Sequence, residues 1–93
     1  MVNLLRVTRS PITKKKWRAE FDDGTHTDFG DSTAQDYTQH KNKARRSLYL
    51  ARHLKDLNTR DPRRAGFLSY YILWGPSTSL TENIRLYKKR FNM

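Results

Sequence analysis

The segment from Ala65 to Trp74, AGFLSYYILW, most limits how this chain can fold. It is the densest apolar and aromatic stretch of a chain whose formal net charge is +10. Such a segment is too short to span a bilayer, which takes about 20 apolar residues. A helix that is apolar on nearly all sides is usually buried, so we predict that the segment forms the central core helix. A base-stacking platform and a dimer interface are the alternatives that the sequence leaves open.

The composition predicts one small domain spanning residues 1–93. Hydrophobic residues make up 35% of the chain and aromatic residues 12%, so the core must be small and largely aromatic. There is no cysteine, which excludes disulfides and thiolate metal sites. The first residues lack the apolar stretch of a signal peptide. We also expect no membrane span, because no apolar run approaches the required length.

A β-hairpin is predicted between Lys16 and Phe29, and its register can be derived. Trp17, Ala19 and Phe21 alternate with charged residues, and Asp22-Asp23-Gly24 suits a three-residue loop with Gly24 in the left-handed conformation. The loop sets these cross-strand pairs: Phe21 with Thr25, Ala19 with Thr27, Trp17 with Phe29, Glu20 with His26 and Arg18 with Asp28. The turn, the apolar face and the charge pairs agree, and a shift by one residue would disrupt all three.

Three further elements are predicted outside the hairpin and the central segment. Residues 2–8 read as a strand with Leu5 and Val7 on one face, and residues 33–41 as a short helical piece around Tyr37. The last helix begins after Ser79, which forms a capping-box pattern with Glu82. Its apolar stripe consists of Leu80, Ile84, Tyr87 and Phe91.

A helix from Lys43 to Leu57 is also predicted, with an apolar arc that we expect to face the core. The arc consists of Ala44, Ser47, Leu48, Leu50, Ala51, Leu54 and Leu57. The opposite side consists of Arg45, Tyr49, Arg52 and Asp56, with Arg46 and His53 near its edge. Together, all these elements predict an α+β fold in which a small antiparallel β-hairpin sheet packs against three to four helices.

Basic residues are spread along the whole chain, with 19 Lys and Arg against nine Asp and Glu. This balance predicts attraction to polyanions, nucleic acid first. No recognised DNA-reading motif is present, so binding should depend on phosphates and not on base edges. The candidate binding residues are Lys14, Lys15, Lys16, Lys41, Lys43, Arg45, Arg46, Arg52, Arg63, Arg64, Lys88, Lys89 and Arg90. A basic surface that serves solubility or an acidic protein partner is the alternative.

The sequence offers little support for catalysis. Asp28-Phe29-Gly30 matches the kinase magnesium motif, but the chain lacks the other kinase motifs. The three histidines have no metal-ligand spacing, and the acids show no arrangement typical of a nuclease. We therefore expect a protein that is not an enzyme, with no catalytic residue, no metal and no cofactor.

An ordered set of short motifs resembles one known group of proteins. The motifs are Phe29-Gly30, Asp36-Tyr37-Thr38, His40-Lys41, Arg45-Arg46, Tyr49-Leu50-Ala51-Arg52-His53, Gly66-Phe67-Leu68-Ser69, Ile72-Leu73-Trp74-Gly75 and Tyr87-Lys88-Lys89-Arg90-Phe91. The set resembles the short, basic, uncharacterised proteins of large nucleocytoplasmic DNA viruses, including marseillevirus-like and mimivirus-like members. The resemblance covers roughly residues 16–92. It implies a viral protein in the virion, or in the host cytoplasm or nucleus during infection, and it supplies no activity and no catalytic residues.

The function expected from the sequence is non-specific nucleic-acid binding by a protein of the virion or the viral factory, with DNA favoured over RNA. The alternative is a structural, cement or interaction protein of the particle that does not bind nucleic acid directly. We also expect a homodimer, because small domains gain stability by association, and contacts with other virion proteins.

Overall fold

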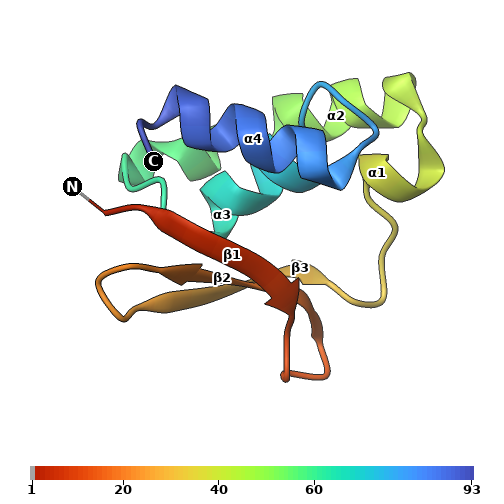
Figure 1. Cartoon of the computed structure of the whole chain (residues 1–93). Helices are drawn as coiled ribbons and strands as arrows, with labels where there is room; N and C mark the ends of the chain where they lie inside the picture. The colour runs from red at the N-terminus through yellow and green to blue at the C-terminus, as the bar shows by residue number, and fades with distance from the viewer. Residues whose placement is uncertain (1) are drawn as a thin grey trace.

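The fold is a three-stranded antiparallel sheet with helical segments packed on one face (Figure 1). It was obtained as a computed structural model and is described for residues 2–93. The strands are β1 (Leu4–Arg9), β2 (Lys15–Phe21) and β3 (His26–Asp31), in the order β1-β2-β3. The helical segments are α1 (Tyr37–His40), α2 (Lys43–His53), η1 (Leu54–Thr59), α3 (Ala65–Leu68), η2 (Ser69–Leu73) and α4 (Leu80–Arg90). The predicted α+β fold is confirmed. Within residues 2–93, no helix combines the length and apolar character needed to cross a bilayer.

The hairpin of β2 and β3 has the register derived from the sequence. Trp17 pairs with Phe29, Ala19 with Thr27 and Arg18 with Asp28. Gly24 adopts a positive φ of 87° in the connecting loop, as the loop prediction requires. Ala19 and Phe29 have no exposed surface and belong to the core under the helices, so the apolar face of the hairpin is the face that the helices cover.

Strand β1 differs from the prediction at one position. A β-bulge interrupts its pairing with β2 between Leu4 and Arg6, and an extra residue in a bulge reverses the alternation of side chains. Leu4 is therefore buried and Val7 packs against the core, whereas Leu5 is exposed. The prediction that Leu5 shares the apolar face with Val7 was wrong because simple alternation cannot register a bulge.

The central segment packs against the sheet as predicted, with one irregularity. It begins as the α-helical turn α3 and continues as the wider π-helical turn η2. Leu68, Ile72 and Leu73 are almost fully buried in the core. Trp74, the residue after η2, is only half-buried and lies at the edge of the core. The segment is thus the core element that the sequence indicated.

The predicted helix 43–57 is shorter and turned differently about its axis. It ends at His53 and continues as the tighter 3₁₀ segment η1. Its inward side carries Arg46 and Tyr49, which are half-buried, whereas Leu48 and Leu54 are 69% and 57% exposed. The expectation that the apolar arc faces the core was therefore wrong, since α2 contacts its neighbours through an arginine and an aromatic ring.

Helix α4 closes the helical layer, and its Ser79 cap and its apolar stripe are confirmed. The Glu82 carboxylate pairs with Arg85 instead of completing the predicted capping box. The Ser79 hydroxyl accepts a hydrogen bond from the Glu82 N–H at 3.3 Å, which satisfies one of the free donors at a helix start. Tyr87 is buried in the core, while Ile84 and Phe91 pack against it. Asn83 is fully buried on the same helix, which the apolar pattern did not indicate.

Asn83 holds the turn that follows the central segment. Its side-chain amide donates to the carbonyls of Ile72 and Ser77 at 2.8 and 2.7 Å, and its carbonyl accepts from the Ser77 N–H at 3.0 Å. Gly75 lies under this side chain, and a Cβ there would collide with Asn83 and with the Tyr71 carbonyl. The turn therefore requires both the glycine and the amide.

Replacing Asn83 with alanine should destabilise the protein by roughly 2–4 kcal/mol, because one buried and two part-buried backbone groups would lose their partners. Urea unfolding gives the free energy directly. Asn58→Ala, at an exposed asparagine, is the control and should change stability by less than about 0.5 kcal/mol. Equal stability of the two variants would contradict this role for Asn83.

Candidate functional site

The basic residues fall into two groups, those held by internal contacts and those that project freely. Lys16 belongs to the first group. Its ammonium lies 2.6 Å from the Asp36 carboxylate and also contacts the Gln39 side chain. Only 13% of the Lys16 side chain is exposed. This lysine therefore links β2 to the start of α1 and has little freedom to bind a partner.

Arg46 is also held. Its Nε donates to the carbonyls of Trp74 and Gly75 at 3.0 and 2.9 Å. The guanidinium carbon lies 5.6 Å from the ring centroid of Tyr37, within range of a cation–π contact. Because the carbonyls at the end of a helical segment lack partners within the helix, Arg46 completes the end of the central segment. The sequence placed it near the edge of the exposed side.

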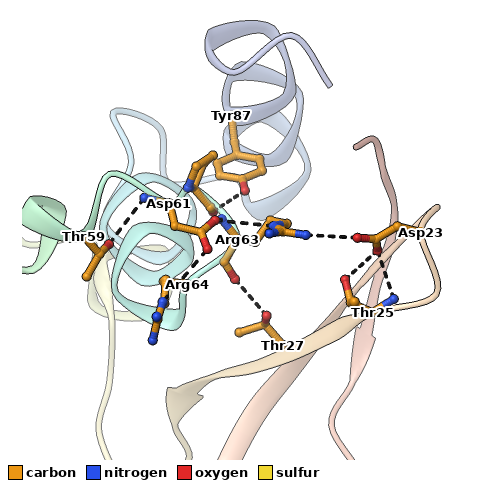
Figure 2. Close-up of polar contacts among 9 residues, drawn as sticks. Asp23, Thr25, Thr27, Thr59, Asp61, Arg63, Arg64 and Tyr87 are labelled. Atoms are coloured by element: carbon orange, nitrogen blue, oxygen red, sulfur yellow. Dashed lines mark hydrogen bonds and ion pairs between the residues drawn. The ribbon is translucent and has the colours of Figure 1, made fainter. Parts of the chain in front are cut away.

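Arg63 is held in the loop that precedes α3 (Figure 2). Its guanidinium lies 3.0 Å from the Asp23 carboxylate and 3.4 Å from that of Asp61. The Arg63 carbonyl also accepts a hydrogen bond from the Thr27 hydroxyl at 2.8 Å. Arg64 is more exposed, and its Nε lies 4.0 Å from Asp61. Arg63 thus ties the loop to the β2–β3 hairpin.

The same loop is tied to α4 by Tyr87. The Tyr87 hydroxyl donates to the Pro62 carbonyl, as Figure 2 shows. Burial raises the pKa of Tyr87 above its ordinary value, so the phenol stays protonated and keeps donating. The two predicted arginines of this loop therefore lie within a structural junction between the sheet and α4.

The free group is concentrated in α2 and its flanks. The sequence from Lys41 to Lys55 contains no Asp or Glu. Its exposed cations are Lys41, Lys43, Arg45, Arg52 and Lys55. Within residues 2–93, none of these five lies within 4.0 Å of a carboxylate. Lys55 was not among the predicted residues, although the acid-free run of sequence could have indicated it.

The other predicted residues do not join this group. Lys14 and Lys15 are exposed in and just before the start of β2. Lys88, Lys89 and Arg90 lie in the last turn of α4, where Arg90 sits over the Tyr71 ring at 4.9 Å. Figure 1 shows the C-terminal end of α4 and the α1–α2 junction at opposite ends of the helical layer. The basic residues at the α1–α2 junction and those in the last turn of α4 therefore lie at opposite ends of the helical layer.

A cavity of about 500 Å³ opens beside α2. Its exposed rim consists of Asp31, Ala34, Gln35, Arg45, Leu48 and Arg52. Tyr49, His53, Ser69, Leu73 and Trp74 lie deeper on its walls. Two of the free cations of α2 therefore stand at the mouth of a cavity whose walls are partly aromatic.

The aromatic wall is a stack of rings centred on Tyr49. Tyr49 lies between His53 and Trp74, with both ring centroids 4.1 Å away and the Trp74 plane tilted by only 4°. Burial raises the pKa of the Tyr49 hydroxyl to about 12, so the phenol is neutral near physiological pH. The sequence placed Tyr49 on the exposed side, and no local pattern signalled that Trp74, 25 positions later, would stack on it.

His40 also packs against Trp74, with ring centroids 5.1 Å apart and ring planes inclined by 56°. Its Nδ1 accepts a hydrogen bond from the Asn42 N–H at 2.9 Å, and Asn42 caps the start of α2. The Nε2 atom is buried and has no hydrogen-bond partner among residues 2–93. His40 therefore helps to position α2, and this role depends on a neutral imidazole.

The side chains of this region have groups that suit contact with an anionic ligand. Guanidinium groups donate to phosphate oxygens in a bidentate geometry, and aromatic walls contact bases. Among the residues that the structure describes, no three His or acidic side chains gather closely enough to hold a metal ion. Fold and site together define a small basic α+β protein with a cationic helix beside an aromatic-walled cavity.

Residues 5–53 match a protein family, so the chain belongs to the family of unknown function DUF5754. The matched region comprises the strands from Leu5 onward, α1 and α2, and thus contains Arg45, Tyr49 and Arg52. No curated protein and no solved structure matches the chain.

Neighbouring arginines of α2 should respond differently to the same substitution. Arg46→Met removes the donor to two carbonyls and should cost roughly 1.5–3 kcal/mol. Arg45→Met removes the same charge from an exposed position and should change stability by less than about 0.5 kcal/mol. Chemical denaturation of both variants tests the assignment, and a larger loss for Arg45→Met would reverse it.

His40 should make stability depend on pH. Burial lowers the pKa of His40 below its ordinary value of 6.5, and the positive charge of Arg45 is the next largest cause. The charge of Asp36 opposes this decrease of the pKa, and the charge of Lys16 contributes to it. The unfolded state therefore binds the proton more readily, so stability contributed by the neutral ring is lost as the pH falls below 6.5. Protonation would also remove the acceptor for Asn42.

Thermal unfolding across mildly acidic and neutral pH checks this effect of His40. The parent should lose more stability on acidification than His40→Gln, whose side chain does not titrate. Profiles of the same shape for parent and variant would show that His40 is not responsible.

Proposed function

We propose that this protein is a non-enzymatic nucleic-acid-binding protein that holds phosphates through the exposed cations of α2 and its flanks, with DNA favoured over RNA. One observation carries the proposal. Lys41, Lys43, Arg45, Arg52 and Lys55 are exposed along a short stretch of chain that contains no acid, and no carboxylate within residues 2–93 pairs with them. Clustered unpaired cations neutralise several phosphates together and release counterions.

The proposed interface is narrower than the sequence suggested. Lys16, Arg46 and Arg63 are omitted because internal partners hold their charges. The exposed Lys14, Lys15, Arg64, Lys89 and Arg90 and the half-buried Lys88 add long-range attraction, since the net charge of +10 acts over the whole surface. Phosphate contacts position a protein but carry little sequence information, so binding should be nearly independent of sequence.

The resemblance to proteins of large DNA viruses gives the proposal a setting. A protein of the virion or the viral factory works beside a large DNA genome, in the particle or in the host cytoplasm or nucleus during infection. A basic protein that binds DNA without sequence preference suits packaging or condensation, where coverage matters more than a particular site.

A second candidate is a structural, cement or interaction protein of the particle. It is favoured by the exposed Leu48 and Leu54 and the exposed Ala44 and Ala51 beside them. This apolar surface of α2 and the start of η1 would contact another virion protein or a second copy of the chain. A homodimer formed through it would oppose the cations of two α2 helices, and like charges at close range are unfavourable.

A salt titration tests the proposed function. Log affinity for duplex DNA should fall linearly with log salt, with a slope of about −0.9 per phosphate neutralised. The double variant Arg45→Gln, Arg52→Gln should flatten the slope by about two units. Lys88→Gln, Lys89→Gln removes the same charge from the last turn of α4, outside the proposed interface, and should change the slope much less.

The outcomes separate the two candidates. Equal slopes for the two double variants would show that only the total charge matters, not its arrangement on α2. Absence of salt-dependent binding by the parent would refute nucleic-acid binding and favour the interaction protein.

A further inference from the structure

We propose that the cavity beside α2 receives an unpaired nucleobase, so that the natural ligand is single-stranded DNA and not the duplex. The inference rests on the proposed function, because the same arginines hold the phosphates. It adds a second component of recognition, the base, which phosphate contacts alone do not use.

The cavity has the size and position that this role requires. Its volume of about 500 Å³ falls within the range of roughly 300–1,000 Å³ typical of small-ligand sites. Two of the exposed cations of α2, Arg45 and Arg52, form part of its rim. A strand lying along α2 would therefore pass over the opening.

The two rim arginines can hold the strand on both sides of a base. They are seven positions apart on one helix, which is about two turns and about 10 Å along the axis. Both are exposed and unpaired among residues 2–93. Charge complementarity thus selects a polyanion as the occupant, with phosphates at the rim and the uncharged base directed inward.

The interior suits a base better than a phosphate. Leu73 and Trp74 supply apolar and aromatic surface, which Leu48 extends at the rim, and Ser69 supplies a hydroxyl. The Lys16 ammonium also lines the cavity, but the Asp36 carboxylate 2.6 Å away holds its charge. Asp31 on the rim is a hydrogen-bond acceptor that repels phosphate but can accept from base amino groups. Tyr49 covers one face of the Trp74 ring at 4.1 Å, which fixes the indole in place at the cavity wall.

This geometry discriminates between single strands and duplex. In a duplex the bases are stacked and paired, and placing one in a cavity requires unstacking it. In a single strand the bases are available for contact with aromatic and apolar side chains, at a gain that is largely independent of sequence. The cavity should therefore add affinity for single strands and none for the duplex.

The experiment compares two strands with equal charge. One is a short oligothymidylate, and the other is the same backbone with abasic units in place of thymidines. The parent should bind the base-bearing strand about tenfold more tightly, the order expected for contact with one base. In a Trp17→Phe variant Trp74 is the only tryptophan, and its fluorescence should change with the base-bearing strand only.

Two exposed leucines provide a matched pair of variants. Leu48 lines the cavity and is 69% exposed, whereas Leu54 is 57% exposed and is not among the lining residues. Leu48→Gln should reduce the preference for the base-bearing strand severalfold, and Leu54→Gln should leave it unchanged. Both substitutions are uncharged and exposed, so folding and the phosphate contacts should be preserved.

Equal affinity of the parent for the base-bearing and abasic strands, with salt-dependent binding to both, would overturn the cavity proposal and leave the proposed function intact. Equal effects of Leu48→Gln and Leu54→Gln would also overturn it. No salt-dependent binding to either strand would refute the proposed function itself.

Discussion

The carbonyl groups at the end of the central helical segment need hydrogen-bond donors, and the rest of the structure depends on how they are satisfied. Asn83 from α4 bonds to Ile72 and Ser77, and Arg46 from α2 bonds to Trp74 and Gly75. A buried carbonyl without a partner costs about 1–3 kcal/mol. The two side chains therefore fix α4 and α2 against the same turn, in a chain too small to rely on apolar burial alone.

The position of the candidate site follows from this constraint. Because Arg46 points inward, Tyr49, three positions later, also faces the central segment and stacks on Trp74. The same rotation turns Arg45 and Arg52 toward the cavity rim and leaves Leu48 exposed. One set of internal bonds thus arranges the free cations, the aromatic wall and the opening of the cavity.

Much of the fold could be predicted from the sequence, and the site only in part. The hairpin register could be predicted because the turn residues, the alternation of apolar and charged residues, and the cross-strand charge pairs all indicated the same pairing. The central segment could be predicted from its apolar composition. The orientation of α2 could not be predicted. The period of its apolar residues indicated burial of Leu48. The contacts that fix the helix are instead made by Arg46 and Tyr49, which are residue types usually assigned to the surface. These contacts join positions far apart in the chain, and a single sequence gives no signal for such pairs.

The central claim is that α2 and its cavity form the binding surface. Its most direct test is a titration of the ¹⁵N-labelled protein with a single-stranded oligothymidylate, in which amide chemical shifts are measured. The account predicts that the largest shifts fall on residues 41–55 and on the indole N–H of Trp74, with small changes in residues 88–90. Shifts centred on residues 88–90, with residues 41–55 unaffected, would contradict it.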